Sequence, residues 1–184
     1  MAGNTHDIHK ALVERCRNGD HRAQYEVYRL YSGAMYNICL RILNHVGEAE
    51  DVLQESFLQA FNKLNELRAD VTFGIWLKRI VVNRSVNALK KRKLQLVEEI
   101  PDSEDVVYEG EEDYELEVKR VHEAIQQLPD GYRIVLTLYL LEGYDHAEIA
   151  EIMAITEGTS KSQYNRAKAK LKTILIRRNY AGQD

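Results

Sequence analysis

Proline and cysteine are scarce in this chain of 184 residues, which holds two of each. Both prolines, Pro101 and Pro129, fall where helices are expected to stop or start, because proline breaks a helix interior. Cys16 and Cys39 lie far apart without a CxxC pair, so we expect reduced thiols in a cytoplasmic protein. The chain has no run of about 18 apolar residues, so we expect no insertion into a membrane. Residues 1–10 also lack the apolar stretch of a signal peptide.

Enzyme motifs are missing as well. The sequence has no glycine-rich phosphate loop, no nucleophile elbow and no HExxH pair. Carboxylates crowd together in residues 96–116, but a flexible acidic run cannot hold a general acid and base in register. The six histidines are scattered and none is joined by a cluster of cysteines or carboxylates. We therefore predict no catalytic residues, no metal site and no cofactor.

Charge is distributed unevenly along the chain. The net charge is −4, but residues 94–117 hold 11 acidic residues and no basic one. Residues 1–93 hold 15 basic and 10 acidic residues, and residues 118–184 hold 10 basic and 8 acidic ones. A uniformly acidic protein would be repelled by DNA, whereas two mildly basic blocks separated by an acidic segment are compatible with DNA binding.

The acidic segment also marks the domain organisation. Residues 96–116 contain Pro101 and Gly110 within the acidic run, which is typical of a flexible, solvated linker. The linker separates a domain at residues 8–95 from a smaller one at residues 117–178. Hydrophobic periodicity on both sides is helical, so we predict an all-α protein with two helical domains.

The periodicity predicts four helices in the first domain and four in the second. In the first they cover about residues 8–18, 20–44, 48–64 and 73–93, with Asp20 as the cap of the second and Gly47 before the third. In the second they begin with residues 117–128 and 131–142.

The last two helices have the spacing of a helix-turn-helix. Asp145 and Glu148 form a capping box, and residues 156–159 break the first helix and start the next. One face of the second helix is apolar at intervals of three and four, and the other is polar and basic. Such a pair places its second helix in the DNA major groove. A plain helical hairpin would have the same apolar spacing.

Residues 73–93 form a second basic feature, with seven basic residues and no acidic one. Basic side chains neutralise phosphates, aromatic rings stack on unpaired bases, and an amide such as Asn83 can contact a base edge. For Trp76 burial in the core is slightly favoured, because a lone tryptophan in an amphipathic helix is usually buried at least in part. For residues 90–93 contact with nucleic acid is favoured, since four consecutive positive charges repel one another.

An acidic helical face lies at residues 48–57, where Glu48, Asp51, Gln54 and Glu55 recur at intervals of three and four. This face is suited to docking a basic partner. It is equally compatible with the ordinary polarity of a helix surface.

Together these features resemble the sigma-70 superfamily of bacterial transcription initiation factors, specifically the small extracytoplasmic-function (ECF) type. Four stretches carry the resemblance in order. They are residues 49–57 (AEDVLQESF), Phe73 with residues 76–83 (WLKRIVVN), residues 128–135 (LPDGYRIV) and residues 157–163 (EGTSKSQ).

The resemblance implies three groups of functional residues. Core RNA polymerase, through its β′ clamp, would be contacted by Asp51, Gln54, Glu55 and Phe57. The −10 promoter element would be melted and read by Leu67, Phe73, Trp76, Lys78, Arg79, Asn83, Arg84, Lys90 and Lys91. The −35 element would be read by Thr159, Lys161, Ser162, Asn165 and Arg166. Residues 67–71 would frame a pocket for a flipped −10 base, and Asn83 would contact that base.

The resemblance also implies partners: core RNA polymerase at its β′ clamp and β flap, promoter DNA and an anti-sigma factor. Four positions depart from the family pattern. Ser160 replaces an apolar residue under the recognition helix, which is expected to loosen that helix. Lys161 and Gln163 replace common arginines, so the −35 preference is not transferable. Leu67 occupies a loop position that is often aromatic, so the −10 preference is not transferable either.

Two other functions remain open from the sequence. One is a stand-alone helix-turn-helix regulator whose N-terminal helices bind an effector or dimerise, and which binds duplex DNA by itself. The other is a helical adaptor that binds protein only.

Overall fold

The computed structural model describes residues 3–68, 70–95 and 113–181. These residues are helical, without a strand among them, which confirms the all-α prediction. The chain divides into two compact units, unit 1 (Met1–Glu98) and unit 2 (Glu99–Asp184). Most of the predicted linker, residues 96–112, lies outside the described residues. Its last four residues, 113–116, belong to the first helix of unit 2, which begins earlier than expected.

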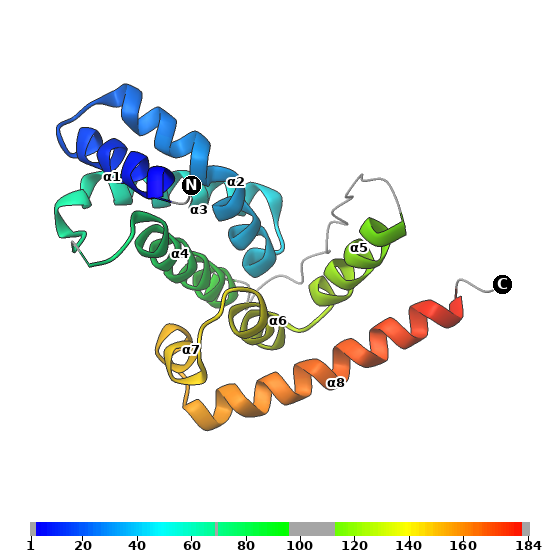
Figure 1. The fold of residues 1–184 in the computed structure, drawn as a ribbon. Coiled ribbons are helices and arrows are strands. Elements are labelled where there is room, and N and C mark those ends of the chain that lie inside the picture. Colours follow the sequence, from blue (N-terminus) through cyan, green and yellow to red (C-terminus); the bar gives the residue numbers. More distant parts are fainter. Residues whose placement is uncertain (1–2, 69, 96–112, 182–184) are drawn as a thin grey trace. The chain divides into compact units, whose positions relative to one another are not determined.

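Unit 1 is a bundle of four α-helices and one short 3₁₀ turn. The elements are α1 (Gly3–Arg17), α2 (His21–Leu43), α3 (Val46–Asn62), η1 (Leu64–Glu66) and α4 (Phe73–Gln95). Helices α2, α3 and α4 pack against one another and α1 lies against α2 (Figure 1). Aliphatic side chains from these three helices fill the core, among them Val27, Leu43, Leu53, Leu77 and Val81.

Local signals in the sequence position two of these helices. The carboxylate of Asp20 accepts hydrogen bonds from the backbone N–H groups of Arg22 and Ala23 at 2.9 and 3.1 Å, so Asp20 is the predicted cap of α2. Helix α3 begins earlier than expected, and Gly47 lies inside its first turn. The cap is His45, whose Nδ1 accepts from the N–H of Glu48 at 3.1 Å.

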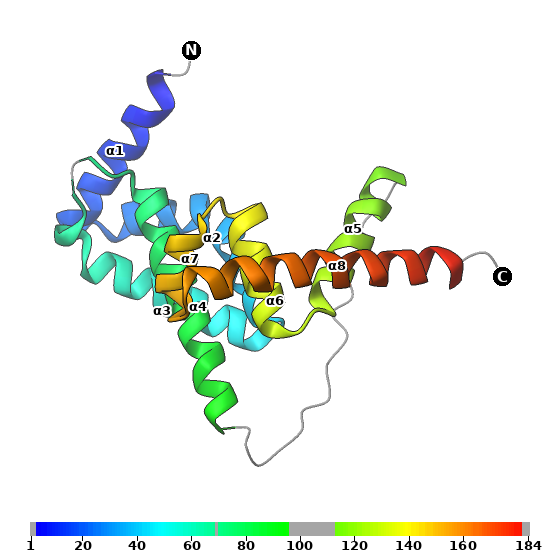
Figure 2. The ribbon, with the colours of Figure 1, turned by 90° about the horizontal axis from the view of Figure 1, so that it is seen from below.

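Unit 2 is built on one long helix. Its elements are α5 (Asp113–Gln126), α6 (Asp130–Leu136), the π-helical turn η2 (Thr137–Leu141), α7 (His146–Met153) and α8 (Glu157–Ala181). Helix α8 runs past α7, then α6 and then α5 (Figure 2). Ile125, Leu128, Leu136 and Ala167 form a buried cluster that joins α5, α6 and α8. The predicted helix over residues 131–142 is therefore one α-helix that ends in a π-helical turn.

The helix-turn-helix differs in detail from the prediction. The capping box of α7 is present, with the Asp145 carboxylate accepting from the Glu148 N–H at 2.8 Å and the Glu148 carboxylate accepting from the Asp145 N–H at 2.9 Å. The turn, however, is made by Ala154 with a left-handed φ of 55°. Residues 156–159 were expected to form the break between the two helices, but α8 already begins at Glu157, and Gly158 lies in its first turn.

Candidate polymerase-docking and DNA-contact surfaces

Three of the four predicted polymerase contacts lie on the surface of α3, and the fourth, Phe57, is buried. Asp51, Gln54 and Glu55 are exposed. Phe57 is 3% exposed, and its ring lies 4.8 Å from that of Tyr28, centroid to centroid. Phe57 therefore holds α3 against α2, while the other three side chains remain accessible to a partner.

Helix α4 has a basic surface over a buried apolar side. Arg79, Lys90 and Lys91 are exposed, and Lys78 is partly exposed. Asn83 is partly exposed, and its Nδ2 donates to the carbonyl oxygen of Arg79 at 2.9 Å. This bond fixes the amide at the helix surface.

Arg84 and Arg92 of α4 have partners within unit 1. Arg84 donates to Oε1 of Gln59 at 2.8 Å and forms an ion pair with Glu55. Arg92 pairs with Glu48 at 3.1 Å and contacts the carbonyl oxygen of Leu43. Arg92 thus has an internal partner, although residues 90–93 were expected to need an external one.

The sequence held a signal for these pairs. Glu48 and Glu55 are seven residues apart, and Arg84 and Arg92 are eight apart, so each set lies two turns apart on one helix face. The pairing Glu48–Arg92 and Glu55–Arg84 follows when the two helices run antiparallel. An acidic face on one helix and a basic face on another therefore predict an internal interface as well as external ones.

The rings at the start of α4 are mostly buried. Phe73 is 6% exposed, and its ring centroid lies 5.3 Å from that of Tyr31 and 6.1 Å from that of Trp76. Trp76 is partly exposed, as the core-anchor interpretation expected. Trp76 thus keeps part of its surface accessible, and its ring lies against that of the buried Phe73.

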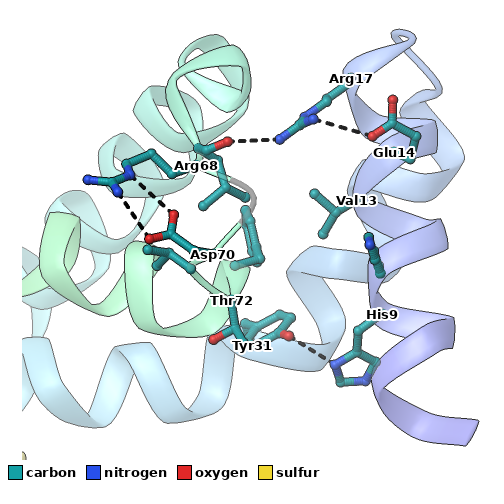
Figure 3. A pocket seen from close by; sticks show the side chains of 12 residues that line it. His9, Val13, Glu14, Arg17, Tyr31, Arg68, Asp70 and Thr72 are labelled. Atoms are coloured by element: carbon teal, nitrogen blue, oxygen red, sulfur yellow. Dashed lines mark hydrogen bonds and ion pairs between the residues drawn. The ribbon is translucent and has the colours of Figure 1, made fainter. Parts of the chain in front are cut away.

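A cavity lies beside the segment that connects η1 to α4. Its volume is about 270 Å³, and it is bounded by α1, by Tyr31 and by residues 67–68 and 70–73 (Figure 3). We call it the α1–loop cavity. Leu67 lines it but is only 8% exposed. Arg68 and Asp70 form two contacts at 3.1 Å on its rim.

The helix-turn-helix presents the predicted polar face. Thr159, Lys161, Ser162, Asn165 and Arg166 are all exposed on α8. Lys161 pairs with Glu157 at 2.6 Å, and this hydrogen bond raises the pKa of the lysine ammonium, which stays charged. Ser162 donates to the carbonyl of Gly158 at 2.9 Å.

Ser160 was expected to loosen α8, but it is fully buried and has a polar partner. Its hydroxyl lies 2.9 Å from Nδ1 of His146 on α7. The ring of His146 stacks on Tyr139, with centroids 4.5 Å apart. A hydrogen bond thus takes the place of the apolar contact and joins the two helices of the motif.

Within the described ranges, no helix is long and apolar enough to cross a membrane. The same residues contain no group of three or more histidines, cysteines and carboxylates placed to hold a metal ion.

Family models for two domains match the chain in the order of its two units. Residues 27–95 match sigma-70 region 2, and residues 119–171 match sigma-70 region 4. The chain belongs to the sigma-70 superfamily, in its ECF group. Region 2 thus covers α3, α4 and most of α2, and region 4 covers the helix-turn-helix.

Relatives of this family match over most of their length. The RNA polymerase sigma-H factor of Pseudomonas aeruginosa is 33% identical over 177 residues, which cover 89% of this chain and 92% of the relative. The ECF RNA polymerase sigma factor SigW of Bacillus subtilis is 30% identical over 179 residues, which cover 90% and 96%.

Solved sigma-factor structures share the fold. The sigma factor RpoE of Bartonella quintana, solved in complex with the anti-sigma factor NepR, superposes with a TM-score of 0.65 at 19% identity, covering 83% of this chain and 96% of that one. CnrH in complex with the cytosolic domain of CnrY gives a TM-score of 0.56 at 22% identity, covering 91% and 97%.

Proposed function

We propose that this ECF sigma factor directs bacterial core RNA polymerase to specific promoters and initiates transcription by binding −35 DNA and melting −10 DNA. One observation carries the proposal. Region 2 and region 4 follow each other in one chain, and each presents an accessible polar surface on a buried helical core. A stand-alone helix-turn-helix regulator would have no need of a region 2 bundle.

Unit 1 has two surfaces for two partners. The exposed side chains of Asp51, Gln54 and Glu55 on α3 dock the β′ clamp, where negative charge speeds association with a basic partner. The exposed lysines and arginine of α4 bind the phosphates of the −10 region. Asn83 and Trp76 contact bases that have left the duplex, the amide through hydrogen bonds and the indole by stacking.

Phe57, Phe73 and Leu67 act indirectly in this proposal. All three are buried in the free chain, so they shape the surfaces that polymerase and DNA touch. Arg84 of α4 contacts both Glu55 and Gln59 of α3. It therefore links the helix proposed to dock polymerase, α3, to the helix proposed to bind −10 DNA, α4.

Unit 2 binds the −35 duplex through α8. A recognition helix contacts base edges with residues of its N-terminal turns, which here are Thr159, Lys161, Ser162, Asn165 and Arg166. Arg166 has the reach for a bidentate contact with guanine, while Lys161 and Ser162 suit phosphates or single base-edge contacts. The region 4 unit is also the expected partner of the β flap.

An anti-sigma factor is the expected regulator. Two structures of the same fold are described as complexes with such a factor or with a partner's cytosolic domain. A protein that covers the acidic face of α3 or the polar face of α8 would prevent holoenzyme assembly or promoter binding.

The proposal is tested by a mobility shift of promoter DNA with and without core RNA polymerase. We expect the purified chain to shift promoter fragments only when core enzyme is present. A shift by the chain alone on paired half-sites would favour the stand-alone regulator, and the absence of any salt-dependent DNA affinity would favour a protein-only adaptor.

A further inference from the structure

Helix α1 lies outside the region 2 match, which begins at residue 27. It nevertheless forms one wall of the α1–loop cavity, through His9, Val13, Glu14 and Arg17 (Figure 3). The opposite wall is the segment at residues 67–68 and 70–73, which overlaps the stretch (residues 67–71) that the family resemblance implies as the frame of a pocket for a flipped −10 base. The wall made by α1 therefore faces the place where that base would bind.

Arg17 holds the first residue of this segment. Its Nη2 donates to the backbone carbonyl of Leu67 at 3.1 Å, and its Nη1 lies 3.4 Å from the carboxylate of Glu14 (Figure 3). Leu67 directly follows η1 as its C-cap, and its side chain is buried. A partly buried hydrogen bond from a charged group is among the stronger ones in proteins, so the start of the segment is tied to α1.

Tyr31 ties the other end of the segment to α1. Its hydroxyl lies 3.0 Å from Nδ1 of His9, and its ring makes an edge-on contact with Phe73. A Cβ at Gly74 would come within 3.0 Å of the Tyr31 ring, so glycine permits this close approach. Contacts with α1 thus hold both ends of the segment, residue 67 through Arg17 and residue 73 through Tyr31 and His9.

The cavity between these two ties has room for a small ligand. Its volume of about 270 Å³ lies just below the range of about 300–1,000 Å³ for pockets that bind drug-sized molecules. Its width depends on the distance between α1 and the segment. The hydrogen bond from Arg17 and the contacts of Tyr31 set that distance.

We propose that α1 determines specificity in −10 recognition, with Arg17 as a positioning residue that fixes the width of the α1–loop cavity through the Leu67 carbonyl. The ligand is a single unpaired base of the −10 strand. Arg17 acts by positioning the segment, because its Nη2 donates to the backbone of Leu67 and its Nη1 lies against the carboxylate of Glu14. This inference rests on the proposed function and extends it to a helix outside the region 2 match.

The test is run-off transcription by the reconstituted holoenzyme from templates that differ only in one base of the −10 element. Arg17→Ala is expected to lower the preference for the best base over the next one by roughly tenfold, which corresponds to the loss of one charged hydrogen bond. Arg17→Lys restores most of the preference, because its ammonium can still donate to the Leu67 carbonyl. Arg22→Ala, which removes an exposed arginine of α2 outside the cavity, leaves the preference unchanged.

Tyr31→Phe provides a second variant in case Arg17→Ala does not fold. It removes the hydrogen bond to His9 but keeps the ring against Phe73, so we expect a smaller loss of preference in the same direction. A uniform loss of transcription on all templates, with the preference ratio unchanged in both variants, would overturn the role of α1 and leave the proposed function intact. If the unaltered chain supports no promoter-dependent transcription, the proposed function fails and this inference fails with it.

Discussion

The hydroxyl of Ser160 lies 2.9 Å from Nδ1 of His146, and this contact joins the two helices of the helix-turn-helix. Ser160 is fully buried, so the loss of its hydroxyl would leave the imidazole nitrogen without this partner. The contact allows a polar residue to occupy a position beneath the recognition helix. Its geometry predicts that Ser160 contributes to the stability of unit 2.

Ser160→Ala should lower the free energy of unfolding of unit 2 by about 1 kcal/mol, the net value of a typical buried hydrogen bond. The matched control is Ser162→Ala, because Ser162 is exposed and should change stability by less than about 0.5 kcal/mol. The only tryptophan, Trp76, lies in unit 1, so its fluorescence reports unit 1 alone. A loss of stability seen in the far-UV circular dichroism transition but absent from Trp76 fluorescence supports the prediction; equal shifts in both Ser variants would contradict it.

The ion pair between Arg84 and Glu55 should couple α3 to α4 weakly. Their side chains are 33% and 59% exposed, so solvent screens the pair, and a double-mutant cycle should give a coupling energy of about 0.2–1 kcal/mol. Urea unfolding followed by Trp76 fluorescence measures it. The coupling should shrink at high salt. The control is a double-mutant cycle of Arg84 with Glu50, which is exposed on the same helix as Glu55. Equal coupling energies for Glu50 and Glu55 would contradict the Arg84–Glu55 pair.

Arg166 should contribute to the choice of −35 sequence. Arg166→Ala is expected to cost about 1–3 kcal/mol of promoter recognition if the guanidinium contacts a base edge. Transcription from a set of −35 variants measures this, with Lys172→Ala, an exposed basic residue further along α8, as the control. An unchanged −35 preference would exclude Arg166 from sequence recognition.

Asn83 should matter for the −10 element and not for polymerase binding. Its amide lies at the surface of α4, held by the Arg79 carbonyl, whereas the docking side chains lie on α3. Asn83→Ala is therefore expected to weaken −10 selection while the variant still competes with another sigma factor for core enzyme. Loss of that competition would place Asn83 in the polymerase interface instead.

The two thiols should ionise only in strongly alkaline solution. Burial raises the pKa of Cys16 and of Cys39 from the ordinary 9.0 to about 11. Because the folded state holds these protons more tightly, their contribution to stability is complete below pH 9 and is lost as the pH rises from 9 towards about 11. Alkylation with iodoacetamide at pH 8 should be slow in the folded chain and fast in urea. Fast alkylation of the folded chain would contradict the burial of both thiols.

Local rules predicted much of the fold. Asp20 and the Asp145–Glu148 box mark helix starts because their carboxylates satisfy free N–H groups that any helix start exposes. The same rules missed His45, because an imidazole nitrogen accepts such a bond less often. They also placed the turn of the helix-turn-helix too late, at residues 156–159, because Ala154 adopts the left-handed conformation that glycine usually provides.

The candidate surfaces were harder to predict because burial depends on contacts between helices. A helical period separates an apolar face from a polar one, and it places Phe57 toward the core. Leu67 follows η1 in a connecting segment, where no period applies, so only the packing of the fold shows that its side chain is buried. The pairing of Arg84 and Arg92 with acids of α3 also depends on the antiparallel packing of two helices, which no single stretch of sequence contains.

Binding of the purified, full-length chain to core RNA polymerase at near-physiological ionic strength tests the proposed function most directly. We expect an equimolar complex that survives gel filtration and starts transcription at promoters that core enzyme alone ignores. Reversing the charge of exposed Asp51 and Glu55 should weaken this complex, with the reversal of Glu26 on α2 as the control. Failure of the unaltered chain to associate with core enzyme under these conditions would contradict its assignment as a promoter-directing subunit.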